Sequence, residues 1–232
     1  MAAFTLKQNG VSFGKSGDYS SVSVALASNP TAGSVVAVRY LFYDGGTTPP
    51  SITSIKDGND NAYAVEAHNS GSTNMDMAGF IGQGYVVAPS NAEKTITVTF
   101  SKTCGSDGVL AIWIDEFAPP AATTASYDDG EVGNGTEAIN TPTIPVSGTE
   151  ELVVSVASDA YTVNSTTGSW ISNAGGNQYN NNAAYILSVS SSTAVGFQGS
   201  SGNVYNAIGM SFKAVASKAI PVFMNQYRQR RN

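Results

Sequence analysis

The chain has 232 residues and a formal net charge of −6, and only 12% of its residues are charged. Its single cysteine excludes an internal disulfide, and the lack of an 18-residue apolar span or an apolar signal region leads us to expect neither membrane insertion nor a signal peptide. Glycine, serine, threonine and asparagine are abundant and strong helix formers are scarce, which predicts an all-β fold of short strands joined by polar turns.

The first half of the chain carries a series of strand patterns. Residues 1–20 are mostly polar, and we expect them to form an N-terminal arm or loop. Beyond them, β-branched and aromatic residues alternate with small or polar ones between turn residues, the pattern of half-buried strands. The expected elements are strands at 21–27, 35–43, 84–88 and 95–100 and a hairpin over 51–67.

The stretch 109–117, VLAIWIDEF, is the longest nearly unbroken apolar run in the sequence. Its β-branched and aromatic residues, bounded by turn residues, predict a central strand covered on both faces. Side chains alternate across a strand, so two sets should face opposite layers. One set is Leu110, Ile112 and Ile114, and the other is Val109, Ala111, Trp113, Asp115 and Phe117.

Beyond a connector at 118–137, rich in proline, glycine and acidic residues, the strand patterns of the first half recur in the same order. Four matched elements predict an internal duplication with halves 21–117 and 138–212. The predicted core consists of Leu110, Ile112, Trp113 and Ile114, with Ile208, Met210 and Phe212 as their counterparts.

So many short strands must close on themselves or stack as two sheets, because a single open sheet would expose a face and two edges. We expect a jelly-roll-like β-sandwich over residues 21–212. Each half is small for a disulfide-free domain, which favours one composite sandwich with interleaved halves over two small β domains. The sequence leaves both arrangements open.

No residue set meets the requirements of a catalytic or metal site. His68 is the only histidine, and Cys104 lies in a turn without an activating neighbour. Asp115 and Glu116 are adjacent on a strand, so their carboxylates should point to opposite faces. The oxygen-rich stretch 57–61 lacks the glycine and glutamate that a calcium loop needs, and a tight turn is expected instead. We therefore expect a non-enzymatic protein without metal or other cofactors.

Aromatic residues in polar stretches are the candidate ligand-binding residues. Rigid rings among asparagine, serine and glycine are typical of loops that bind carbohydrate or protein. These residues are Tyr127, Tyr161, Trp170, Tyr179 and Tyr205. The alternative is that Trp170 closes an edge of the core and the tyrosines are ordinary surface residues.

The last 20 residues differ from the rest of the chain in charge. Residues 1–212 hold all 17 acidic residues and six basic ones, a balance of −11, whereas residues 213–232 hold five basic residues and no acidic one. We expect 213–232 to form an assembly arm that binds an acidic body, giving a dimer or trimer. The residues expected to make this contact are Ile220, Val222, Phe223, Met224, Tyr227, Arg228, Arg230 and Arg231. The acidic body argues against nucleic acid as a partner.

Three motifs resemble β-sandwich modules of bacteriophage virion proteins and bacterial surface proteins over residues 20–214. They are Gly-Ser-Val-Val-Ala-Val at 33–38, SITSIKDGNDNAY at 51–63, and strands that close in aliphatic-x-x-Phe; Lys56-Asp57-Gly58 departs from the more usual Asp-Ser-x-Gly-Asn run. The resemblance implies an exterior structural or attachment role without transferable catalytic residues.

Two functions follow as hypotheses. The first is a virion structural protein on the particle surface, such as a capsid decoration or head-fibre-like subunit, made in the host cytoplasm and bound to a capsid or other virion protein. The alternative is a carbohydrate-binding or adhesin module that reads host glycans through its aromatic loops.

Overall fold

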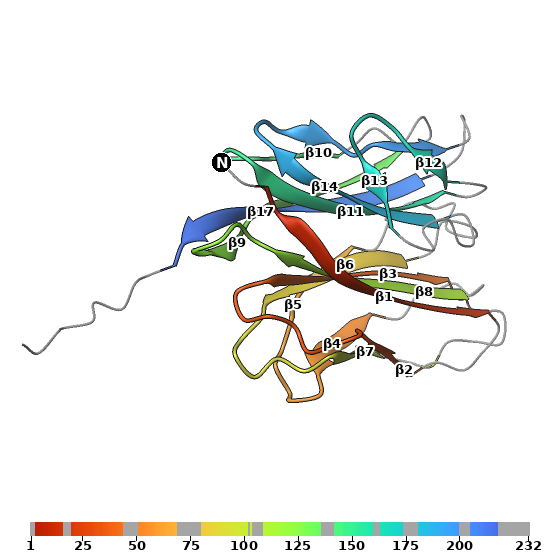
Figure 1. The fold of residues 1–232 in the computed structure, drawn as a ribbon. Coiled ribbons are helices and arrows are strands. Elements are labelled where there is room, and N and C mark those ends of the chain that lie inside the picture. The colour runs from red at the N-terminus through yellow and green to blue at the C-terminus, as the bar shows by residue number, and fades with distance from the viewer. Residues whose placement is uncertain are drawn as a thin grey trace, which may run out of the picture.

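The computed structural model describes residues 3–15, 20–43, 51–68, 80–101, 103, 109–135, 142–159, 163–173, 181–199 and 205–217. Within these residues the chain forms seventeen β-strands and no helix, hence no helix that could cross a membrane. The predicted all-β sandwich architecture is confirmed, because the strands form antiparallel sheets that stack in layers (Figure 1).

The first half builds two sheets. A five-stranded sheet has the order β1-β8-β3-β6-β5, and a three-stranded sheet has the order β2-β7-β4. The strands are β1 (Thr5–Lys15), β2 (Ser21–Ala25), β3 (Val35–Tyr43), β4 (Ile52–Asp57), β5 (Ala64–His68), β6 (Phe80–Val87), β7 (Thr95–Phe100) and β8 (Val109–Ala118).

The second half builds a five-stranded sheet of order β13-β14-β11-β17-β9 and two ribbons, β10-β15 and β12-β16. The strands are β9 (Thr123–Gly135), β10 (Thr143–Ile144), β11 (Glu151–Asp159), β12 (Val163–Thr166), β13 (Ile171–Ser172), β14 (Asn181–Val189), β15 (Thr193–Ala194), β16 (Phe197–Gly199) and β17 (Tyr205–Ala216).

The two large sheets have the same strand order. β1, β8, β3, β6 and β5 correspond in turn to β9, β17, β11, β14 and β13. In both small layers the strand after β3 or β11 pairs with a strand that comes later in the chain than β6 or β14: β4 pairs with β7, and β12 pairs with β16. Each half therefore begins with an edge strand and ends with the strand that pairs with it.

This arrangement corrects three expected boundaries. Residues 5–15 are not an arm or loop but β1, which pairs with β8 along its length. Residues 123–135 of the expected connector form β9, which pairs with β17. The expected arm at 213–232 begins too early, because β17 continues to Ala216. Both missed strands are sheet edges with one neighbour, where polar and glycine residues are tolerated and the alternating pattern is weak.

The expected hairpin over 51–67 is also corrected. β4 pairs with β7 and β5 pairs with β6, so the two strands lie in different sheets. Between the two arms there is an isolated bridge at Lys56 and Ala62, with hydrogen bonds from Tyr63 N to Ile55 O at 3.0 Å and from Asp57 N to Asn61 O at 3.2 Å. The turn at 57–61 thus carries the chain from one layer to the other.

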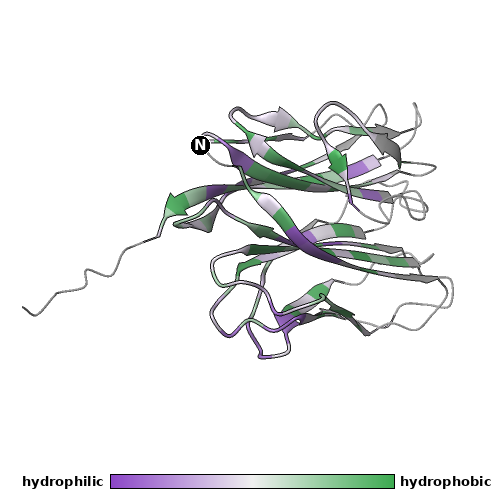
Figure 2. Ribbon diagram, in the orientation of Figure 1, coloured by the Kyte–Doolittle hydropathy of each residue, from purple (hydrophilic) through white to green (hydrophobic). Residues whose placement is uncertain are grey.

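The layers enclose three zones of apolar packing. The first half has an outer core between its two sheets, with Val38, Ile96 and Ile112 among its members. The second half has its own outer core, with Val153 and Phe197 among its members. A central zone lies between the two five-stranded sheets. Figure 2 shows long apolar stretches on the strands of both large sheets, as expected for strands covered on two faces.

The predicted roles of 109–117 and of the core residues are confirmed. Leu110, Ile112 and Ile114 pack in the outer core of the first half, whereas Ala111, Trp113 and Phe117 face the second half. All seven predicted core residues are at most 2% exposed. The expected interleaving of the halves is not observed, since every strand pairs within its own half, and the halves join instead through their large sheets.

The central zone has reciprocal contacts between equivalent residues. Tyr85 pairs with Ala37 and Tyr185 with Val154, so the two tyrosines occupy equivalent positions, as do Phe117 and Phe212. The rings of Tyr85 and Phe212 meet edge-on at 5.2 Å, and those of Phe117 and Tyr185 at 5.1 Å. Each half therefore presents the same aromatic pair to the other, as in an isologous dimer interface.

Candidate functional site

A charged cluster lies within the central zone. The Arg39 guanidinium forms an ion pair with Asp115 and donates hydrogen bonds to Asn173 Oδ1 at 3.1 Å and Ala184 O at 3.2 Å. Asn173 in turn donates to the Asp115 carboxylate. Arg39 and Asp115 are fully buried, and desolvation lowers the pKa of Arg39 to about 9, so it stays charged at neutral pH. The cluster links β3 and β8 of the first half to the second half.

The Glu116 side chain lies on the opposite face of β8 from Asp115. Its carboxylate accepts hydrogen bonds from the Gln8 side chain on β1 and from the backbone N–H of Thr31, the latter at 2.7 Å. Gln8 also bonds the backbone N–H and carbonyl of Ser28. As expected, Asp115 and Glu116 diverge, and each carboxylate is engaged in holding strands and loops in place.

The turn at 57–61 is organised by Asp57. Its carboxylate accepts backbone N–H bonds from Asn59, Asn61 and Glu93 at 2.9 to 3.0 Å and a side-chain bond from Asn61 at 2.7 Å. Burial alone would raise the pKa of Asp57, but these hydrogen bonds outweigh it and hold the pKa below its usual value. The expected tight turn is confirmed, with Asp57 as its centre.

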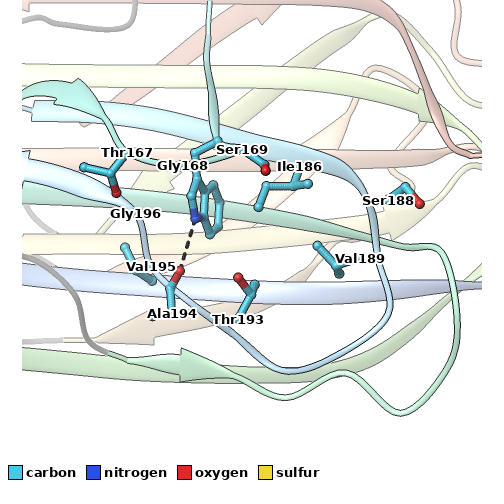
Figure 3. A pocket seen from close by; sticks show the side chains of 11 residues that line it. Thr167, Gly168, Ser169, Ile186, Ser188, Val189, Thr193, Ala194, Val195 and Gly196 are labelled. Carbon is cyan, nitrogen blue, oxygen red and sulfur yellow. Dashed lines mark hydrogen bonds between the residues drawn. The ribbon is translucent and has the colours of Figure 1, made fainter.

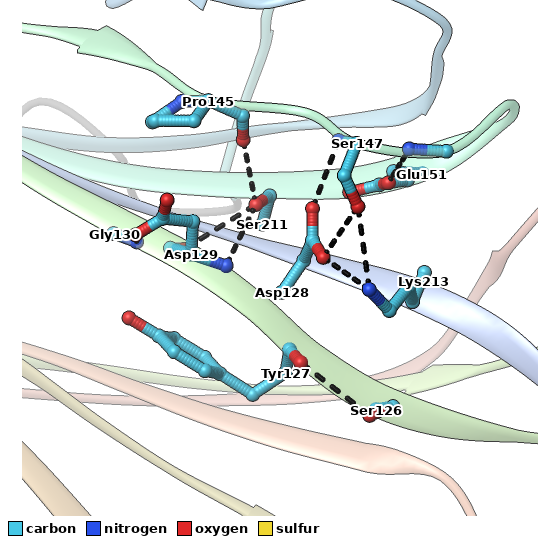
Figure 4. Close-up of polar contacts among 11 residues, drawn as sticks. Ser126, Tyr127, Asp128, Asp129, Gly130, Pro145, Ser147, Glu151, Ser211 and Lys213 are labelled. Atoms are coloured by element: carbon cyan, nitrogen blue, oxygen red, sulfur yellow. Dashed lines mark hydrogen bonds and ion pairs between the residues drawn. The ribbon is translucent and has the colours of Figure 1, made fainter.

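A second charged cluster lies near the C-terminal end of β17 (Figure 4). Asp128 accepts hydrogen bonds from the backbone N–H and hydroxyl of Ser147, at 2.9 and 2.7 Å, and forms an ion pair with Lys213. Burial opposes ionisation, yet these contacts lower the pKa of Asp128 to about 2. Nearby Glu151 accepts the Gly148 N–H, and its burial raises its pKa. The cluster ties β9, β17 and the segment before β11 together.

An open hollow of about 450 Å³ adjoins this cluster. It is lined by Pro120, Ala121, Thr123, Gly148, Thr149, Glu150, Lys213 and Ala214. The hollow therefore combines small apolar groups with one acidic and one basic side chain, next to the point where the chain leaves β17.

The candidate aromatic residues do not form one exposed surface. Tyr127 is half-buried and stacks on Tyr85, with ring centroids 4.8 Å apart and planes within 5°. Tyr205 is 3% exposed and packs in the outer core of the second half, as does Trp170 at 7%. Tyr161 and Tyr179 lie outside the described residues. Of the described candidates, Trp170 lines an open pocket.

The Trp170 pocket is an open cavity of about 350 Å³ in the second half (Figure 3). The indole nitrogen donates a hydrogen bond to Ala194 O at 3.1 Å, which holds the ring against the end of β15. The lining consists of Thr167, Gly168, Ser169, Trp170, Ile186, Ser188, Val189, Thr193, Ala194, Val195 and Gly196.

The remaining candidates cannot be placed. The candidates outside the described residues are Cys104, the side chain of His68, and the expected arm contacts Ile220, Val222, Phe223, Met224, Tyr227, Arg228, Arg230 and Arg231. Within the described part of the chain, no group of three or more histidine, cysteine, aspartate or glutamate side chains could hold a metal ion.

No family model and no curated protein matches the chain.

Sequence reasoning missed Arg39 and the hydroxyl groups of the Trp170 pocket. The signal for Arg39 was present, since one arginine within the run VVAVRYLFY predicts a buried charge that needs a partner. Serine and threonine are so frequent in this chain that those around Trp170 carry no signal of their own.

Proposed function

We propose that this chain is a non-enzymatic structural protein on the surface of a virus particle, a capsid decoration or head-fibre-like subunit that docks through its C-terminal segment. The observation that carries the proposal is the basic charge of that segment together with the acidic side chains near the end of β17. β17 ends at Ala216, three residues after Lys213, which pairs with Asp128 near Glu151 and lines the adjoining hollow. Residues 218–232, which follow, hold four basic residues and no acidic one.

The segment has the composition of a contact rather than of a solvated tail. Ile220, Val222 and Phe223 stand close together ahead of the arginines, and exposed apolar segments of this kind usually mark an interaction site. Every copy carries both a basic segment and an acidic body, so exchange between copies is self-complementary and can close into a dimer or trimer.

The use of the charged residues supports a role without catalysis. Asp57, Glu116 and Asp128 each accept two or more hydrogen bonds that hold turns or strands, and Asp115 is paired with Arg39. A general acid or base needs a proton-transfer position facing substrate. Carboxylates engaged in this way are suited to stabilising a rigid, layered body.

The placement on a virus particle rests on the likeness of the 33–38 and 51–63 motifs to virion sandwich modules. Its test is co-sedimentation. Particles purified from producing cells should contain the full chain, and a chain ending at Ser217 should be lost from the particle fraction while remaining folded by circular dichroism.

A matched control separates charge from apolar contact. Arg228, Arg230 and Arg231 replaced together by glutamine should weaken incorporation, more so at low salt than at moderate salt, because salt already screens exposed charge pairs in the full chain. If the chain ending at Ser217 is incorporated as well as the full chain, the segment is not the docking element. If neither chain is found on particles, the virion assignment is wrong.

A further inference from the structure

The outer layers of the two halves differ at one place. In the first half, β7 runs unbroken and pairs with β2 on one side and β4 on the other. In the second half the corresponding strand is divided into β15, which pairs with β10, and β16, which pairs with β12. The division falls at Val195 and Gly196.

Trp170 occupies this division. It directly precedes β13, as Tyr63 directly precedes β5, so the two rings hold equivalent places in their halves. A Cβ atom built on Gly196 would lie 2.0 Å from Trp170 Cδ1, so the indole packs against bare backbone there. The Gly196 carbonyl accepts the Thr167 N–H at 2.8 Å, a contact that lies outside any strand ladder. The interrupted strand and the indole together form the pocket.

We propose that the Trp170 pocket binds a single neutral sugar residue. The observation is the chemistry of its lining residues: Thr167, Ser169, Ser188 and Thr193 carry hydroxyl groups, the others include aliphatic residues and Trp170, and none of the described residues lining the pocket is charged. A sugar ring has the same mixture, with hydroxyls on its edge and C–H groups on its face, which suits an aromatic or aliphatic wall.

Other ligand classes fit this wall less well. A phosphate, carboxylate or metal ion would find no charged partner among the lining residues, and burying a charge without one is costly. A wholly apolar ligand would cover the hydroxyl groups without offering them hydrogen bonds, which also costs free energy. The volume of about 350 Å³ lies in the range of small-molecule sites and admits one ring.

This site is distinct from the docking segment in place and chemistry. It does not use the charges of residues 213–232, and it replaces the dispersed set of five aromatic residues by one pocket with Trp170. A surface protein with such a pocket would contact glycans while its C-terminal segment holds it in place. Failure of sugar binding would leave the docking proposal unaffected.

The test uses the full chain and a panel of methyl glycosides of glucose, galactose, mannose and N-acetylglucosamine. Saturation-transfer NMR detects the binding of each glycoside. A ligand of about a dozen non-hydrogen atoms at ordinary efficiency gives a Kd on the order of 1 mM. Amide shifts in a ¹⁵N spectrum should change at 167–170 and 193–196. A glycan array then shows whether a sugar is bound free or at a chain end.

The decisive variant is Ser188→Arg, which places a long side chain in the pocket. The matched control is Ser190→Arg, because Ser190 is exposed and does not line the pocket. We expect affinity to fall at least about tenfold in Ser188→Arg, roughly 1.4 kcal/mol, and to stay unchanged in Ser190→Arg. The absence of saturable binding by the unmodified protein up to about 20 mM of every glycoside would overturn the proposal. Shift changes away from 167–170 and 193–196, or full binding by Ser188→Arg, would do the same.

Discussion

The two halves of this molecule build the same large sheet but close their outer layers differently. The first half covers its core with a continuous three-stranded sheet, whereas the second uses two ribbons separated at Val195 and Gly196. Tyr63 and Trp170 hold equivalent places in their halves. Of these two residues, Trp170 lies at a break in the outer layer and Tyr63 does not. The repeated sheet maintains the fold, so the outer layer of one half is free to depart from the pattern and form a pocket.

A second difference lies in the central zone. By strand register, Arg39 and Asp115 of the first half correspond to Val156 and Met210 of the second. One half thus contributes a buried ion pair where the other contributes apolar side chains. Because Asn173 and the Ala184 carbonyl complete the pair, the two faces fit each other in one orientation.

The largest expected effect is at the centre of the shared zone. Trp113→Ala removes a fully buried indole, and the free energy of unfolding should fall by about 3–5 kcal/mol. Its counterpart Ile208→Ala removes a smaller side chain from the same packing cluster and should cost less. Urea unfolding measures both, and a loss below about 1 kcal/mol for Trp113→Ala would contradict the central packing.

The ion pair gives the next effect. Arg39→Met leaves the buried Asp115 carboxylate without its cation and should cost about 3–5 kcal/mol of unfolding free energy. The double variant Arg39→Met with Asp115→Met copies the apolar character of the other half and should recover most of that loss. Equal losses in the single and double variants would show that the charges do not act as a pair.

The break in the outer layer gives a smaller effect. Gly196→Ala forces the Trp170 ring away from the backbone and should lower the free energy of unfolding by about 1–3 kcal/mol. The control is Ser190→Ala, an exposed position that should change it by less than about 0.5 kcal/mol. Thermal or urea unfolding measures both variants. An unchanged free energy of unfolding for Gly196→Ala would mean that the ring does not lie against Gly196.

The smallest effect is the pH dependence of Asp128. Its pKa in the folded protein is about 2, below the ordinary value of about 4, so its contribution to stability is present above about pH 4 and is lost as the pH falls through about 2. Asp128→Asn should cost about 1 kcal/mol at neutral pH, allowing for solvent screening, and nothing near pH 2. Asp129→Asn is the exposed control in urea unfolding at several pH values. A loss that is independent of pH would exclude this origin.

Much of the architecture could be predicted because it depends on local alternation. The run 109–117 predicted a strand with two apolar faces, and its residues occupy the two expected layers. β1 and β9 could not be predicted so readily, since an edge strand needs only one neighbour and its polar residues obscure the pattern. The separation of β4 from β5 depends on pairings with distant strands, which a turn sequence does not encode.

The candidate sites divide in the same way. The arginine at position 39 in an apolar run signals a buried partner, but its identity as Asp115 and Asn173 depends on how two halves pack. Trp170 was singled out by its ring, whereas the pocket around it comes from a strand break 25 residues away at Val195. Contacts between segments that lie apart in the chain require the fold to be known.

Assembly through the C-terminal segment is the central functional claim, and light scattering tests it most directly. The full chain should have the mass of a dimer or trimer at low salt, reduced at moderate salt, while a chain ending at Ser217 should be monomeric under both conditions. Equal masses for the two chains at both salt concentrations, with folding intact by circular dichroism, would contradict the claim.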